Sequence, residues 1–328
     1  MKKLLLILTL NISLLFSPPP KAGTTDPNGR YVSLSPFAGF FLNPDTYGFI
    51  FPAIEPGQLL TSQSQRQSRP LFILAGSAIG YAITGLTWPF HNRLLRLYGA
   101  FWRGTYPADR ILLIGNFYLG FLLLNVLVLW LSLFLFERIF FSGIRRSRDA
   151  EYSLYFLMVF IVSNPVTKAF FWTVHQQMFS FLTPIFCIYV LLWFNRRPDA
   201  LSGRQMIMLF LGGGALLLVY GNFLLLLPVM LFGFFQQFRK FPGQESRLLL
   251  KASGLFLVFF LPTILWIGIL KWTGVSYYSF ELQGYHEIIW IPETLHYSVG
   301  SFLKQLGQNT LEFLGTLRQF GILMLFSV

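Results

Sequence analysis

The fold is decided by the stretch ILLIGNFYLGFLLLNVLVLWLSLFLF at residues 111–136, which contains no charged side chain. At 1.5 Å per residue, a helix of this length can cross the roughly 30 Å hydrocarbon core of a bilayer. This stretch, an apolar segment at the N-terminus and the other apolar stretches together predict an all-α, polytopic transmembrane helical bundle of about nine spans. The other stretches lie at residues 70–88, 152–172, 179–194, 206–220, 223–235, 248–270 and 303–328.

The composition agrees with a lipid environment. The chain has 328 residues, of which 54% are hydrophobic and 12% charged, and its mean hydropathy is +0.58. A soluble domain carries about 25% charged residues. The net charge is +12, and its basic residues lie between apolar stretches, so we expect membrane lipids and no nucleic acid as partners. The single cysteine, Cys187, excludes a disulfide within the chain and a cysteine-based metal site.

The N-terminus begins with a lysine pair followed by an apolar segment. Residues 1–16 therefore form a first transmembrane helix or signal anchor, and we favour an uncleaved helix because no clear cleavage site follows. The lysines hold this end in the cytoplasm, which places residues 17–69 on the non-cytoplasmic side of the membrane. Residues 70–328 would form the bundle, with a second external loop at about 272–301. We expect an integral, multi-pass protein of the plasma (inner) membrane, truncated at its C-terminus because the chain ends within an apolar run.

The arginine-rich breaks pose a question of topology. The clusters at residues 93–110 and 138–148 cannot both be cytoplasmic if residues 111–136 cross the membrane once. An arginine cluster on the outer side would suit a phosphate, because guanidinium groups match its oxygens. The simpler interpretation is that these arginines extend to ordinary lipid headgroups.

Two of the apolar stretches, 206–220 and 223–235, are short for a full crossing. They could form a broken or re-entrant pair around Tyr220-Gly221-Asn222. The glycine triplet at residues 212–214 lies inside the first of them and lacks the lysine of a phosphate loop, so close helix packing is its better explanation.

The first external loop contains the leading catalytic candidate, Asp45. A carboxylate among aromatic residues at the membrane surface is partly desolvated, which raises its pKa and makes it a better proton acceptor. The simpler alternative is that Asp45 caps a helix that starts at Thr46. Residues 49–60 could include a short surface helix, and Glu55 is a second acid of this loop.

Further polar candidates lie at the ends of apolar stretches. Arg69 precedes Pro70 at a helix start, where it could pair with a lipid-linked phosphate or serve as a membrane anchor. His175, with the glutamines that follow it, could hydrogen-bond a hydroxylated ligand, and Lys168 is a lone cation beside aromatic residues. An ordinary polar helix end explains His175, the glutamines and Lys168 equally well.

The late external loop contains acids and histidines, but their spacing matches no ligand motif. We therefore assign no metal site, although a Mg²⁺ or Mn²⁺ held by carboxylates and a substrate phosphate would leave almost no motif. The residues concerned are Glu281, His286, Glu287, Glu293 and His296.

Several short patterns follow one another in a particular order along the chain. They are Pro44-Asp45-Thr46-Tyr47, Arg69-Pro70-Leu71-Phe72, Ser163-Asn164-Pro165 and the run from Gly213 to Pro228-Val229. In this order the chain resembles the membrane half of GT-C glycosyltransferases, the group that includes lipid A aminoarabinose transferases and protein mannosyltransferases. It departs from that pattern at Thr46, where the family has a second acid, at Ser68-Arg69, and at Tyr220-Gly221-Asn222, where a lysine is common.

The resemblance implies inverting transfer of a sugar from a polyprenyl-phosphate donor to a lipid, glycan or protein acceptor on the non-cytoplasmic face. It implies that Asp45 is the catalytic base or the acid that orients the acceptor, and that Arg69 lies near the leaving phosphate. The remaining candidates for substrate binding are Glu55, Lys168, His175, Tyr220 and Asn222. Two other functions stay open: a lipid or polysaccharide transporter or flippase, and a non-catalytic subunit of a membrane assembly.

Overall fold

The computed structural model describes the chain in two units, Met1–Tyr277 and Tyr278–Val328, which we treat separately. The predicted first helix at residues 1–16 lies outside the described residues. Those are residues 30–35, 38–42, 45–62, 64, 66–102, 106–163, 165–196, 201–238, 245–277 and 290–325.

The first unit is dominated by helices, as predicted. Among the described residues, four helical segments are long and apolar enough to cross a membrane, which supports a membrane protein; the number of about nine spans is not confirmed. They are Pro70–Gly99, Ala108–Gly143, Gln176–Arg196 and Leu248–Trp272. They contain α3 (Pro70–Thr87), α5 (Ala108–Gly143), α8 (Phe179–Arg196) and most of α11 (Glu245–Trp272).

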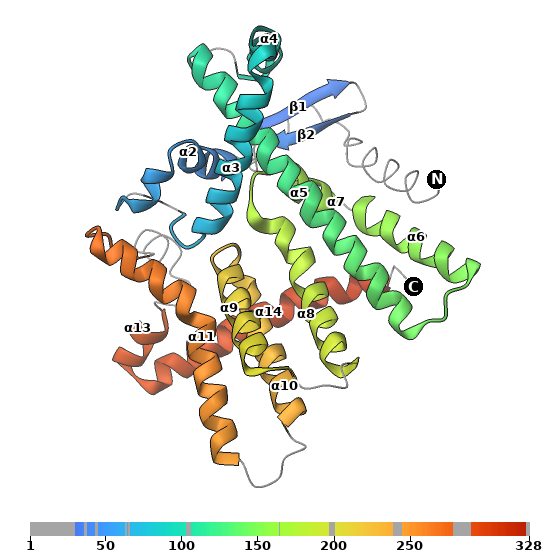
Figure 1. The fold of residues 1–328 in the computed structure, drawn as a ribbon, viewed down its shortest axis with the longest axis vertical. Coiled ribbons are helices and arrows are strands. Elements are labelled where there is room, and N and C mark those ends of the chain that lie inside the picture. Colours follow the sequence, from blue (N-terminus) through green and yellow to red (C-terminus); the bar gives the residue numbers. More distant parts are fainter. Residues whose placement is uncertain are drawn as a thin grey trace. The chain divides into compact units, whose positions relative to one another are not determined.

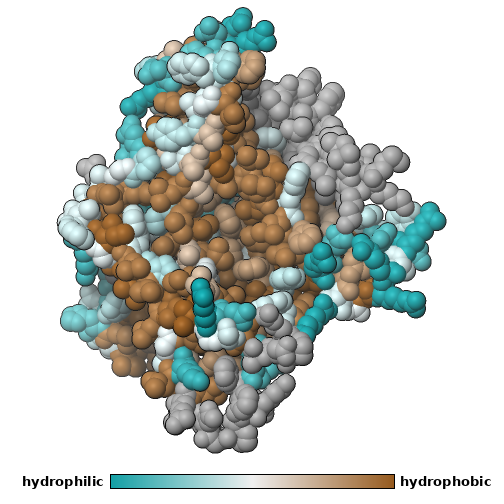
Figure 2. Space-filling view, viewed as in Figure 1, coloured by the Kyte–Doolittle hydropathy of each residue, from teal (hydrophilic) through white to brown (hydrophobic). Residues whose placement is uncertain are grey.

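Exposed apolar side chains on these helices argue for surrounding lipid. Only 17% of the apolar part of α11 is buried, and Leu249, Leu257 and Leu265 are among its exposed residues. Water would hydrate such a surface poorly. Figure 2 shows hydrophobic residues over much of the visible face, with hydrophilic residues gathered at α4 (His91–Trp102), where the sequence has Arg93 and Arg96.

The long helix α5 organises the first unit (Figure 1). Helix α3 runs antiparallel to its first half, because Gly76 faces Phe121 and Gly80 faces Phe117. Helix α8 runs along its second half, where Arg196 donates to the carbonyl of Ser142 at 2.9 Å. Helices α3 and α8 therefore both begin near the middle of α5 and run toward its opposite ends.

One predicted span is broken. Residues 152–172 form α6 (Arg148–Ser163) and α7 (Pro165–Trp172), not a single helix. Proline lacks an amide hydrogen and restricts the residue before it, so Pro165 begins a new helix. Asn125, at the middle of α5, donates to the carbonyls of Phe171 at 2.8 Å and Thr173 at 3.1 Å, which fixes the non-helical stretch after α7.

The two short apolar stretches form a helical hairpin. They are α9 (Gly203–Leu217) and α10 (Leu226–Phe238), joined by a turn and η4 (Gly221–Leu225). Ser202 and Gln205 form a capping box that starts α9. The amide of Leu201 donates to Gln237 Oε1 at 3.1 Å, so the hairpin's two ends lie together and its turn lies at the far end.

The region predicted as an external loop is more structured than expected. It contains α2 (Asp45–Ile54) and η1 (Pro56–Leu60), which confirms the prediction of short helices. It also contains an antiparallel hairpin of β1 (Arg30–Ser35) and β2 (Ala38–Leu42), a local departure from the predicted all-α architecture. Alternation of side chains over so few residues is a weak signal in a sequence rich in turn residues.

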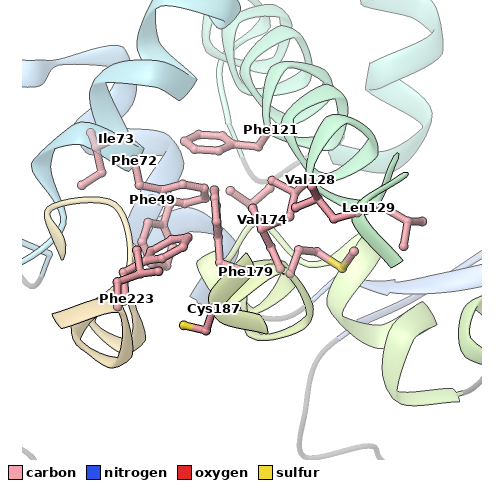
Figure 3. Packing of buried hydrophobic residues seen from close by; sticks show 14 of the residues in the cluster. Phe49, Phe72, Ile73, Phe121, Val128, Leu129, Val174, Phe179, Cys187 and Phe223 are labelled. Atoms are coloured by element: carbon pink, nitrogen blue, oxygen red, sulfur yellow. The ribbon is translucent and has the colours of Figure 1, made fainter. Parts of the chain in front are cut away.

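The core of the first unit is aromatic. Phe49 of α2, Phe72 of α3 and Phe121 of α5 are almost fully buried, and the ring of Phe72 lies 5.4 Å from that of Phe49 and 5.1 Å from that of Phe121. Figure 3 shows these rings gathered with Phe179 of α8. The core therefore lies where α2 meets the starts of α3 and α8.

The second unit contains α13 (Trp290–Tyr297) and α14 (Val299–Leu325). The rings of Trp290 and Phe302 stack with a 5.8 Å separation. Helix α14 covers most of the predicted span at residues 303–328, but the described part of it is not among the segments apolar enough to cross a membrane.

Candidate functional site

Polar side chains from distant segments meet at the starts of α3 and α8. Arg69 immediately precedes α3, and the buried Gln176 begins η3 (Gln176–Met178), which leads into α8. With the side-chain amide of Gln176 turned so that its oxygen faces Arg69, this oxygen accepts from Nε at 2.9 Å and from Nη1 at 2.5 Å. The contact holds the Arg69 guanidinium at the junction of the two helices.

A second arginine, Arg66, connects this junction to Asp45. Arg66 Nη2 donates to Asp45 Oδ1 at 3.1 Å, and the guanidinium carbon lies 4.7 Å from the centre of the Phe49 ring. The Arg66 side chain is 6% exposed, whereas that of Asp45 is 49% exposed. About half of the Asp45 side chain is therefore covered, and the prediction that this carboxylate is partly desolvated by the membrane surface stays a prediction. Asp45 stands in the first turn of α2, where a carboxylate is favoured by the helix dipole.

His175 contacts the aromatic core and lies within electrostatic range of both arginines. Its ring packs against that of Phe49 in a T-shaped arrangement with centroids 5.1 Å apart, and its buried Nδ1 has no hydrogen-bond partner among the described residues. Burial lowers the pKa of His175 to about 3, with further contributions from the positive charges of Arg69 and Arg66. The imidazole is therefore neutral at physiological pH and can accept or donate a hydrogen bond.

The turn of the α9–α10 hairpin reaches the same junction. The amide of Leu71, in the first turn of α3, donates to the carbonyl of Leu218 at 3.1 Å. Asn222 Nδ2 donates to the Tyr220 hydroxyl at 2.9 Å. Burial raises the pKa of Tyr220, while Arg69 and the Asn222 hydrogen bond act in the opposite direction. The structure thus brings Tyr220 into the electrostatic range of Arg69.

The end of η1 and helix α11 hold the backbone just before α3. The side chain of Gln67 donates to the carbonyls of Leu59 and Thr61, which ties the end of η1 to the residues before α3. The indole of Trp266 on α11 donates to the Gln67 carbonyl at 2.7 Å. The backbone between Arg66 and Arg69 is therefore held on two sides.

These contacts define a cluster, which we call the arginine junction, and it lies beside the middle of α5. Five of the seven predicted site residues belong to it: Asp45, Arg69, His175, Tyr220 and Asn222. Glu55 lies beyond the opposite end of α2, about 15 Å from Asp45 along the helix axis, and accepts from Gln58 Nε2 at 2.7 Å. Lys168 is half-buried on α7, and its predicted role in substrate binding stays a prediction.

Arg66 was not a sequence-based candidate, although it is the partner of Asp45. The sequence feature that could have identified Arg66 is its position three residues before Arg69, which places two arginines just before one helix start. Asn125 was likewise missed, and its signal was an amide within a long apolar run. Gln176 was noted only as a neighbour of His175.

A groove of about 500 Å³ opens beside α2, close in sequence to both members of the Asp45–Arg66 pair. Its lining combines the aromatic rings of Tyr47 and Phe51 with the polar side chains of Gln58, Thr61 and Ser64. The ring of Tyr106 lies 6.0 Å from each of these two aromatic rings. This mixture of flat apolar surfaces and hydroxyl or amide groups can hold a polar organic molecule.

The described residues contain no group of three or more side chains suited to a metal ion. Of the late-loop candidates, Glu293 and His296 lie on α13, and Glu281, His286 and Glu287 lie outside the described residues. Comparisons with protein-family models, with curated proteins and with solved structures found no match to this chain.

Proposed function

We propose that this chain is a membrane glycosyltransferase of the GT-C type. It would move a sugar from a polyprenyl-phosphate donor to a lipid, glycan or protein acceptor on the non-cytoplasmic face. The plasma-membrane location and the full set of about nine spans belong to the same proposal. The observation that carries it is the arginine junction, where the half-exposed carboxylate of Asp45 pairs with Arg66 and Arg69 binds Gln176 at the starts of membrane-length helices.

The electrostatics of the junction favour a phosphate. Arg66 and Arg69 bring two positive charges close to His175, which is neutral. The start of α8 adds the partial positive charge of a helix N-terminus. A phosphate released from the donor would be stabilised by these groups, because guanidinium forks match phosphate oxygens.

The chemistry requires one proton acceptor and a stabilised leaving group. An acceptor hydroxyl would attack the anomeric carbon as the bond from that carbon to the donor phosphate breaks, which inverts the configuration. Asp45 would take the hydroxyl proton, and polyprenyl phosphate would leave toward Arg69. The side chain of Asp45 is 49% exposed, so an acceptor hydroxyl can reach it from outside the core. A bound divalent cation could share the phosphate charge, although the proposal does not depend on it.

The groove beside α2 offers a place for the acceptor. Tyr47 and Phe51 can stack against the apolar face of a sugar or lipid headgroup, and Gln58, Thr61 and Ser64 can hydrogen-bond its hydroxyl groups. An acceptor in this groove would lie on the first unit, next to the helix that begins with Asp45.

The test uses full-length protein in cells that lack the gene and in proteoliposomes with defined polyprenyl-phosphate sugars. Asp45→Asn should reduce release of polyprenyl phosphate by a factor of about 10² or more, as expected for loss of a general base. Asp109→Asn is the matched control, because Asp109 is also an exposed acid in the first turn of a helix. Full activity of a folded Asp45→Asn protein, or unchanged lipid-linked sugar pools after gene deletion, would refute the proposal.

A second candidate is a transporter or flippase for a lipid-linked substrate. The observation that favours it is the meeting of interrupted helices beside the middle of α5, an arrangement that transporters use for substrate binding. The same proteoliposomes distinguish the two functions. Movement of an intact donor between leaflets without release of polyprenyl phosphate would favour the transporter.

A further inference from the structure

A second basic site lies far along α5 from the arginine junction. A pocket of about 400 Å³ opens between the last turns of α5 and α8. Its charged lining consists of Arg138, Arg146 and Arg196 together with Glu137. The pocket therefore carries an excess of positive charge, although Phe134, Phe141 and Leu192 give it an apolar part.

The three arginines differ in what already holds them. Arg146 is neutralised, because it donates to Glu137 Oε1 and to Glu151 Oε1, each at 3.0 Å. Arg196 donates from Nη2 to the carbonyl of Ser142 at 2.9 Å, which fixes its guanidinium over the end of α5. Arg138 extends over the ring of Phe134, with its guanidinium carbon 5.0 Å from the ring centre.

Arg138 and Arg196 have no carboxylate within ion-pair distance among the described residues. Each guanidinium has five N–H donors, and the contacts above use only some of them. Two positioned guanidinium groups at one pocket can bind the oxygens of a phosphate in the bidentate manner that arginine favours.

The position of the pocket specifies the source of the phosphate. Helices α5 and α8 are both long and apolar enough to cross a membrane, and both end beside this pocket. Tyr189 and Trp193 also line it, and such aromatic residues gather at the boundary between hydrocarbon and headgroups. A basic pocket between spanning helices at that depth meets lipid phosphates directly.

We infer that this pocket binds the phosphodiester headgroup of an anionic phospholipid. Arg138 and Arg196 hold the phosphate, while Tyr189 and Trp193 contact the glycerol and the upper acyl chains. The remaining surface of α5 beside the pocket is suited to the chains, because Phe134 and Leu131 are exposed and apolar. The inference does not depend on the proposed glycosyl transfer.

The experiment measures lipid retention by the full-length protein with native mass spectrometry after titration with phosphatidylglycerol or phosphatidylcholine. Wild-type protein should retain phosphatidylglycerol preferentially. The double variant Arg138→Gln/Arg196→Gln should weaken that binding by about tenfold or more, the effect of losing hydrogen bonds to a charged group. The control is Arg93→Gln/Arg96→Gln, which removes the same charge from α4 and should leave binding unchanged.

Competition with inorganic phosphate separates the two sources of this chemistry. Failure of inorganic phosphate to displace phosphatidylglycerol supports the lipid site, and displacement at equal concentration would overturn it in favour of a soluble phosphate. Equal retention of both lipids by the wild type, or equal weakening by the pocket variant and the α4 control, would also overturn the inference. Equal melting temperatures of the variants in phosphatidylcholine verify that each is folded.

Discussion

The glycine triplet of α9 allows a sharp test of how the helices pack. A methyl group added at Gly214 would overlap the carbonyl oxygen of Phe259 on α11 and lie 2.8 Å from its carbonyl carbon. A methyl group at Gly212, two residues earlier, would meet no atom within 4 Å. The variants Gly214→Ala and Gly212→Ala therefore add the same group to the same helix in opposite surroundings.

The magnitude follows from the atom that is in the way. The obstacle at Gly214 is backbone and cannot rotate aside. Restoring a normal contact of about 3.5 Å to the carbonyl carbon alone requires α9 and α11 to separate by about 0.7 Å, and the closer carbonyl oxygen requires more. Overpacking of this kind costs about 1–3 kcal/mol. Alanine also improves the helix by about 1 kcal/mol over glycine, equally at both positions. The difference between the variants, about 1–3 kcal/mol, therefore reports the overpacking alone.

The assay is unfolding of both variants and the wild type in mixed micelles by titration with a denaturing detergent, followed by tryptophan fluorescence. We expect Gly212→Ala to be at least as stable as the wild type and Gly214→Ala to be less stable than both. A Gly214→Ala protein as stable as Gly212→Ala would show that α9 and α11 do not approach at this point.

Three further predictions concern the core around the arginine junction. Below pH 6.5 the unfolded state binds a proton at His175, whereas His175 stays neutral in the folded state. The free energy of unfolding should therefore fall by about 2 kcal/mol between pH 6.5 and 5. Thermal denaturation measured across this range should show a smaller loss for His175→Gln. Asn125→Leu leaves two backbone carbonyls without their side-chain donor, and chemical unfolding should show a loss of about 1–3 kcal/mol. Gly76→Ala overlaps the Phe121 ring whereas Gly85→Ala meets open space, so only the former should lower the melting temperature.

The helices of the first unit could largely be predicted, because long uncharged stretches have few alternatives. The predicted ends of the stretch at residues 111–136 differ from those of α5 because its helix continues through charged residues on both sides, such as Arg110 and Arg138. The break at Pro165 was missed because apolar residues continue across it, and hydropathy does not register a missing amide hydrogen.

The site could be predicted residue by residue but not as an arrangement. Asp45, Arg69, His175 and Tyr220 were found because polar groups beside apolar runs are conspicuous. Their meeting depends on contacts across more than 100 residues, such as that between Arg69 and Gln176. No local pattern encodes such contacts. The same limit explains why the ion pair of Asp45 with Arg66 was not predicted, since the surroundings of Asp45 come from the fold and not from its neighbours in sequence.

The length of α5 has a consequence for the lipid around the protein. This helix has 36 residues, and its uncharged part spans about 39 Å, roughly a third more than the hydrocarbon thickness of a typical bilayer. If α5 crosses the membrane, it must lean or the surrounding leaflets must thicken to cover it. Thinner and thicker membranes would then tilt this helix differently and move its midpoint, where Asn125 positions the segment leading to His175.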